Sequence, residues 1–138
     1  MLVASSMGAT AFQRGLGSMH ALAHPLGALY DAHHGTLNAV LMPYVLVANR
    51  SAIEGRMEVL ARHLQLPTAG FDGVLAWVLE LRKQFAIAHS LAELGIDESR
   101  ADLIAQMAVV DGAAGTNPIA HDESRYREIF INAVRGEL

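Results

Sequence analysis

The apolar residues of this chain recur at helical spacing almost from one end to the other. No stretch keeps the alternation of apolar and polar residues that is typical of a strand. The pattern therefore predicts an all-α fold, a bundle of roughly seven helices without a sheet. With 138 residues, of which 52% are hydrophobic, the chain is large enough to bury one core. We expect residues 1–138 to form a single helical domain.

Glycine, proline and capping residues separate the expected helices. These helices cover residues 1–12, 18–29, 34 or 35 to 48, 51–64, 69–85, 97–111 and 122 onward, with a single turn over 90–95. Side chains that cap helices are expected at Ser51 and Ser90, each with a glutamate three residues later, and at Asp97 and Asp122. The longest irregular stretch is residues 112–121, which contains Gly115, Asn117 and Pro118.

One stretch, from Gly15 to Asn38, concentrates the side chains that carry chemistry. It reads GLGSMHALAHPLGALYDAHHGTLN and holds four of the seven histidines, His20, His24, His33 and His34. Histidine is a common metal ligand and the usual proton carrier near neutral pH. In a helix, His20 and His24 lie at positions i and i+4 and project from one face. The stretch therefore indicates a metal or acid–base site, although solvated helix faces also carry such pairs.

The distance along the chain limits which of these histidines can act together. A straight helix would separate His20 from His34 by roughly 21 Å, which is too far for a shared ion. The helix must therefore stop between them. Pro25 removes a backbone donor and disfavours helical geometry at His24, and glycines nearby offer easy bends. We expect residues 30–33 to make the connecting turn, so that His34 can return towards His20.

Other polar residues have simpler interpretations. His63, His89 and His121 are isolated in the sequence and are expected to be structural or surface residues. Asp31 either orients a histidine ring nitrogen or forms the turn between two helices. Ser18 is expected to cap the helix that follows it.

Composition excludes several classes of function. The net charge is −4 and Lys83 is the only lysine, so neither nucleic acid nor an acidic membrane surface is a favoured partner. The chain has no cysteine, which excludes disulfides and fits a cytoplasmic location. Residues 1–12 lack the basic start of a secretory signal, and residues 37–48 are too few to span a bilayer. Both segments are expected to be buried helices.

The histidine stretch has a further property. The run GLGSMHALAHPLGALYDAHHGTLNAVLMPYV resembles the C-terminal signature of the iron-containing (group III) alcohol dehydrogenases, which are NAD(P)-dependent metal enzymes. The similarity extends over nearly the whole chain, through SLAELGI and the closing GTNPIAHDESRYREIF. It implies the metal-binding helical C-terminal domain of that family. In a complete member, the reaction is hydride transfer between an alcohol or aldehyde and NAD(P).

The resemblance also assigns roles to individual histidines. The family holds a divalent metal, Fe²⁺, with one aspartate and three histidines. The resemblance implies that His20 and His34 are the last two histidine ligands of the metal. It implies that His24 lies beside the metal and helps the proton relay near the nicotinamide, which makes it the catalytic histidine. His33 matches no required position. Zn²⁺ or Ni²⁺ would suit imidazole ligands at least as well as Fe²⁺.

Other parts of the family pattern lie outside this sequence. The aspartate and the first histidine ligand come from an upstream helix, and the nucleotide-binding domain lies further upstream. Gly15 and Gly17 do not replace that domain, because no GxGxxG motif follows a strand here, and we assign no cofactor-binding residue. The chain alone is therefore expected to bind metal weakly and to be inactive, with a further copy or the missing N-terminal domain as its partner. The alternative is a non-catalytic, self-associating helical module from a truncated gene.

Overall fold

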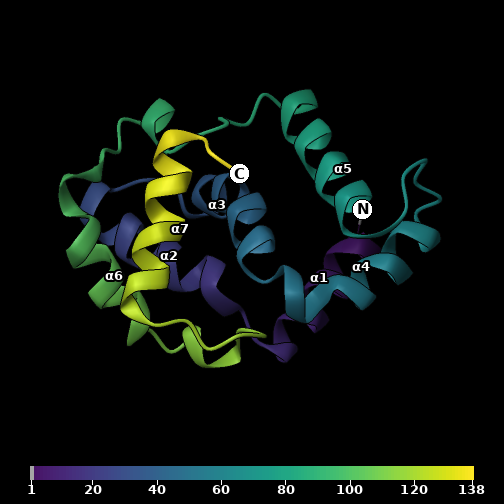
Figure 1. Ribbon diagram of the computed structural model, residues 1–138, viewed down its shortest axis with the longest axis horizontal. Helices are drawn as coiled ribbons and strands as arrows, with labels where there is room; N and C mark the ends of the chain where they lie inside the picture. The colour runs from purple at the N-terminus through teal and green to yellow at the C-terminus, as the bar shows by residue number, and fades with distance from the viewer. Residues whose placement is uncertain (1) are drawn as a thin grey trace.

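The computed structural model describes residues 2–138, which form helices and turns and no strand (Figure 1). The α-helices are α1 (Leu2–Ala11), α2 (Gly17–Tyr30), α3 (His34–Ala48), α4 (Arg50–His63), α5 (Gly70–Gln84), α6 (Ala101–Val109) and α7 (Glu123–Arg135). Short 3₁₀ turns are η1 (Phe12–Arg14), η2 (Ala92–Leu94), η3 (Glu98–Arg100) and η4 (Ala114–Thr116). The all-α prediction is confirmed.

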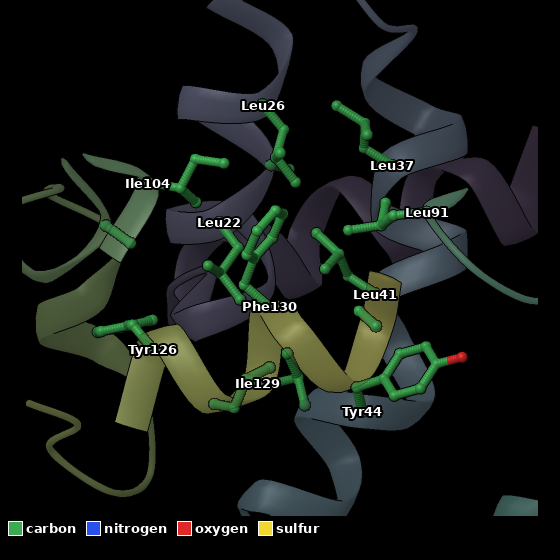
Figure 2. Packing of buried hydrophobic residues seen from close by; sticks show 14 of the residues in the cluster. Leu22, Leu26, Leu37, Leu41, Tyr44, Leu91, Ile104, Tyr126, Ile129 and Phe130 are labelled. Carbon is green, nitrogen blue, oxygen red and sulfur yellow. The ribbon is translucent and has the colours of Figure 1, made fainter. Parts of the chain in front are cut away.

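The main core lies where α2, α3, α6 and α7 pack together. Figure 2 shows Phe130 of α7 between leucines of the two histidine-bearing helices, Leu22 of α2 and Leu41 of α3. Tyr126 and Phe130 are fully buried, and each such side chain contributes on the order of 1.5–3 kcal/mol through burial. This packing holds α2 and α3 side by side, and these are the helices that carry the clustered histidines.

A smaller apolar cluster joins α4 to α5, apart from α6 and α7 (Figure 1). Ala61, Val74 and Val78 form its buried part. Gly73 allows the start of α5 to approach the preceding turn, since a Cβ atom here would lie 1.9 Å from the carbonyl oxygen of Thr68. Helices α6 and α7 thus pack on the two helices that carry the clustered histidines, whereas α4 and α5 form a lateral pair.

Helix α2 matches the predicted helix over residues 18–29 to within one residue at each end, and Pro25 lies inside it. The helix continues to Tyr30 and ends at Asp31, which adopts left-handed geometry with φ 51°. Pro25 is buried, as are Leu22 and Leu26 on the same helix, so tertiary packing compensates for the one backbone hydrogen bond that proline removes. The predicted turn follows the helix, between the end of α2 at Tyr30 and the start of α3 at His34.

Most of the predicted caps are present. Ser90 and Glu93 exchange hydrogen bonds, since the Glu93 carboxylate accepts from the Ser90 N–H (3.0 Å) and Ser90 Oγ accepts from the Glu93 N–H (3.4 Å). Asp122 accepts from the Arg125 N–H at 2.8 Å and caps α7. Asp97 caps the η3 turn that leads into α6. These sequence-based assignments are confirmed.

The capping box predicted at Ser51 is absent. Helix α4 begins at Arg50, and its first turn has no side-chain cap. The Arg50 guanidinium instead donates to Glu54 at 3.3 Å and to Asp72 of α5 at 2.9 Å. The glutamate is therefore engaged by an arginine that links the two lateral helices.

Helix α1 has the predicted helical structure but is not buried. Leu2, Val3 and Met7 are 89%, 74% and 68% exposed, and no described residue of α1 enters the core. Met1 lies outside the described residues. By contrast, α3 buries much of its length, as predicted. Across residues 2–138, none of the helices combines the length and the apolar character that crossing a bilayer requires.

Candidate functional site

Three histidine rings meet where α2 lies against the start of α3. The ring centroids of His20 and His34 are 5.2 Å apart, those of His24 and His34 are 5.5 Å apart, and those of His20 and His24 are 6.0 Å apart. The rings of His24 and His34 are stacked, with an angle of 13° between their planes. The turn after α2 thus brings His34 back to His20, as the sequence predicted.

Asn38 joins two of these rings. Its Nδ2 atom donates to the Nε2 atom of His20 at 3.2 Å and to the Nε2 atom of His34 at 2.9 Å. An imidazole nitrogen that accepts a hydrogen bond carries a lone pair and no proton. The lone pairs of His20 and His34 therefore face one point, which is the arrangement that two ligands of a single ion need.

His20 is the buried member of the cluster. Its side chain is only 7% exposed, whereas His24 and His34 are exposed. The rings of Phe12 and His20 make a T-shaped contact with their centroids 5.9 Å apart. Burial lowers the pKa of His20, and the neighbouring imidazoles of His34 and His24 lower it further. A lowered pKa keeps His20 neutral near pH 7, and only the neutral ring binds a metal.

His24 has a different partner. Its Nδ1 atom lies 2.9 Å from Oδ2 of Asp111, a residue 87 positions later that follows the end of α6. The other carboxylate oxygen of Asp111 accepts from the backbone N–H of Ala113 at 2.8 Å. The partner of His24 is therefore a carboxylate, whereas the partner of His20 and His34 is the amide of Asn38.

Sequence reasoning missed two residues of this site, Asn38 and Asp111. Asn38 lies four residues after His34, so helical spacing alone could have placed both side chains on one face. Nothing in the sequence links Asp111 to the histidines, because only the packing of α6 on α2 brings them together. Asp31, which the sequence offered as a possible partner, is exposed and forms the turn.

The fourth clustered histidine has a structural role. His33 precedes α3, and its Nδ1 atom accepts from the backbone N–H of Thr36 at 3.3 Å. This is an N-cap, usually made by a serine, threonine or aspartate side chain. Outside the cluster, His89 bonds to the Gly136 carbonyl at 3.1 Å, and His121 packs edge-on against Tyr126.

The sequence suggested that Ser18 caps the start of α2. In the structure, side chains of a distant loop cap it instead. Thr116 Oγ1 accepts from the Gly17 N–H at 3.2 Å, and Asn117 Oδ1 accepts from the Ser18 N–H at 3.0 Å. The Ser18 hydroxyl is buried and lies 3.1 Å from the Tyr126 hydroxyl. The irregular stretch over residues 112–121 therefore fixes the helix that carries His20 and His24.

The ligand set contributed by this chain is small. Within residues 2–138, no group of three histidine, aspartate or glutamate side chains is arranged to hold a metal ion. His20 and His34 therefore form a pair and not a group of three candidate ligands.

The model of the Fe-containing alcohol dehydrogenase family, C-terminal part, matches residues 1–134. Among curated proteins, the chain is similar to a 4-hydroxybutyrate dehydrogenase of Cupriavidus necator, with 38% identity over 94% of this chain and 36% of the relative. It is similar to a 1,3-propanediol dehydrogenase of Klebsiella pneumoniae, with 35% identity over 96% of this chain and 36% of the relative. The chain therefore spans about a third of the length of these relatives.

Solved structures agree with the sequence comparison. The fold superimposes on a 1,3-propanediol oxidoreductase with a TM-score of 0.80 and 33% identity, over 86% of this chain and 32% of that structure. It superimposes on an iron-containing alcohol dehydrogenase from Thermococcus thioreducens with a TM-score of 0.77 and 30% identity, over 88% of this chain and 32% of that structure. The helices seen here correspond to one part of these larger proteins.

Proposed function

Because this chain belongs to the Fe-containing alcohol dehydrogenase family, we propose that it is the metal-binding helical domain of such an enzyme. In the complete enzyme, the reaction is hydride transfer between an alcohol or aldehyde and NAD(P). The observation that carries this proposal is the convergence of His20 and His34, whose Nε2 atoms face the same amide nitrogen of Asn38.

His20 and His34 fit the role of metal ligands. The Nε2 atom of each ring accepts a hydrogen bond from Asn38, and burial favours the neutral form of His20. When bound, the ion acts as a Lewis acid that lowers the pKa of the alcohol. The family metal is iron, and an imidazole nitrogen binds Zn²⁺ or Ni²⁺ at least as well. The remaining ligands and the nucleotide-binding domain would come from outside this chain, which spans about a third of its relatives.

His24 fits the role of the proton carrier. Its ring lies within 6.0 Å of both proposed ligands, but its Nδ1 atom is held by Asp111. The side chain is 43% exposed, so a proton taken up at the ring can pass to solvent. His24 would therefore hold the alcohol proton while the proposed ligands His20 and His34 hold the ion.

A second candidate function is a non-catalytic, self-associating helical module. The exposed apolar side chains of α1 favour it, because a large exposed apolar surface commonly marks a contact with another protein. This function does not require His20 or His34 to bind anything. The partner of the chain, whether a further copy or an N-terminal domain, and a cytoplasmic location remain parts of our proposal.

The first test is a calorimetric titration of the purified chain with Zn²⁺, Ni²⁺ and Fe²⁺. We expect weak binding that is lost in the His20→Ala/His34→Ala double variant, because two imidazoles form only part of a ligand set. The matched control is His63→Ala, which removes an exposed histidine of α4 and should leave binding unchanged.

Two outcomes would count against the proposed site. Equal binding by the double variant and the control would place the ion elsewhere. The absence of binding by the unmodified chain would favour the self-associating module. Iron that survives a chelator wash would mean that further ligands complete the site, for example across a dimer interface.

A further inference from the structure

We propose that Asp111 is a positioning residue that fixes the tautomer and the orientation of His24, so that Nε2 is the nitrogen that receives the substrate proton. The catalytic consequence rests on the function proposed above. The tautomer itself is a property of this chain and can be measured without a metal or a nucleotide.

The contact determines where the neutral ring carries its proton. Asp111 Oδ2 lies 2.9 Å from His24 Nδ1, and an ionised carboxylate can only accept a hydrogen bond. The neutral His24 ring must therefore carry its proton on Nδ1. The lone pair then lies on Nε2, at the opposite side of the ring.

The carboxylate is itself held in place. Its Oδ1 atom accepts from the Ala113 N–H at 2.8 Å, and the Asp111 N–H donates to the carbonyl of Ala108 at 3.2 Å. The side chain is 19% exposed, compared with 43% for His24. Ala108 is fully buried on α6, which packs against α2. The tertiary contact between the two helices thus fixes the distance from Asp111 to His24.

The ring has a second support. His34 stacks on His24 with parallel planes, which restricts rotation about the side-chain bonds of His24. In the proposed reaction, the O–H bond of the alcohol breaks and its proton joins the Nε2 lone pair. The resulting imidazolium keeps its Nδ1–H bond to Asp111, whose negative charge stabilises it. Asp111 does not touch the substrate and acts only through His24.

The test uses ¹⁵N-labelled histidine and two-bond ¹⁵N–¹H correlations on the metal-free chain. The spectra are read for the neutral ring, in which only one of the two nitrogens carries a proton. We expect the unmodified chain to show protonated Nδ1 and bare Nε2. A bare Nδ1 in the unmodified chain would overturn the proposal, whether or not any variant folds.

The Asp111→Asn variant should invert the tautomer. The Ala113 N–H needs an acceptor, so the amide oxygen of the asparagine is expected to take the place of Oδ1. The amide NH₂ then faces His24 and donates to Nδ1, which moves the ring proton to Nε2. The two nitrogen signals of His24 should exchange their protonated and bare character.

Asp31→Asn is the matched control. Asp31 is an exposed aspartate at the end of α2, and asparagine tolerates its left-handed backbone. Asp31→Asn should leave the His24 signals unchanged, while Asp111→Ala should give a mixture of tautomers. If Asp111→Asn keeps protonated Nδ1 in a folded chain, the proposal fails. The metal titration is independent of this result, so failure of the proposed function and failure of this inference are distinguishable.

Discussion

Gly15 lies where the chain enters α2, and its missing side chain allows the distant loop to reach that helix. Its φ is 100°, a region that residues with a side chain rarely adopt. A Cβ atom at this position would lie 2.3 Å from Cβ of Thr116. Thr116 caps the start of α2, so a substitution at Gly15 disturbs both the backbone and the cap.

We predict that Gly15→Ala lowers the free energy of unfolding by about 1–3 kcal/mol, which is the cost of a strained backbone residue. Thermal or urea denaturation measures the change. Gly112→Ala is the control, because its added Cβ meets no atom within 4 Å. Equal stability of the two variants would show that the loop adjusts without cost.

At the scale of elements, α2 depends on residues about 100 positions away. Its first backbone N–H groups donate hydrogen bonds to the side-chain oxygens of Thr116 and Asn117. The Asn117 amide also donates to Asn49 at 2.7 Å. One side chain therefore joins the start of α2 to the end of α3. Its loss should affect the helix that carries His20 and His24.

We predict that Asn117→Ala costs about 1–3 kcal/mol of stability, since it removes a cap and leaves a partly buried N–H without a partner. The histidine signals of His20 should shift in the same variant. Gln106→Ala is the control, because it removes an exposed amide whose hydrogen bond to Glu123 is long, at 3.4 Å. A change no larger than that of the control would contradict the capping role.

At the scale of the whole molecule, α1 projects apolar side chains that the described chain does not cover. Met7 is 68% exposed and Ser5 is also exposed on the same helix. We predict that the chain self-associates and that Met7→Lys weakens this association, because a charge on an apolar contact is costly. Ser5→Lys adds the same charge as a control. Light scattering that shows a monomer for all three proteins would refute the prediction.

The whole molecule also limits the chemistry. Catalysis requires the ion, the alcohol and the nicotinamide to be held together, and this chain spans about a third of its relatives. We predict no NAD(P) reduction by the purified chain with any alcohol. Measurable reduction that His20→Ala abolishes would show that the chain contains a complete site.

The sequence by itself determined the helical class, most caps and the family. Helical periodicity, the Ser90–Glu93 box and the caps at Asp97 and Asp122 depend on residues close together in the chain, so local patterns reveal them. The spacing of His20 and His24 is local in the same sense. The need for a turn before His34 followed from helix geometry alone.

Tertiary structure decided which side chains cap α2 and which acid holds His24. Pro25 stays inside the helix because α2 is buried, although proline disfavours a helix locally. Asp111 meets His24 across 87 residues because α6 packs on α2. Such contacts depend on the summed burial of many side chains, and no spacing along the chain records which distant surfaces will meet.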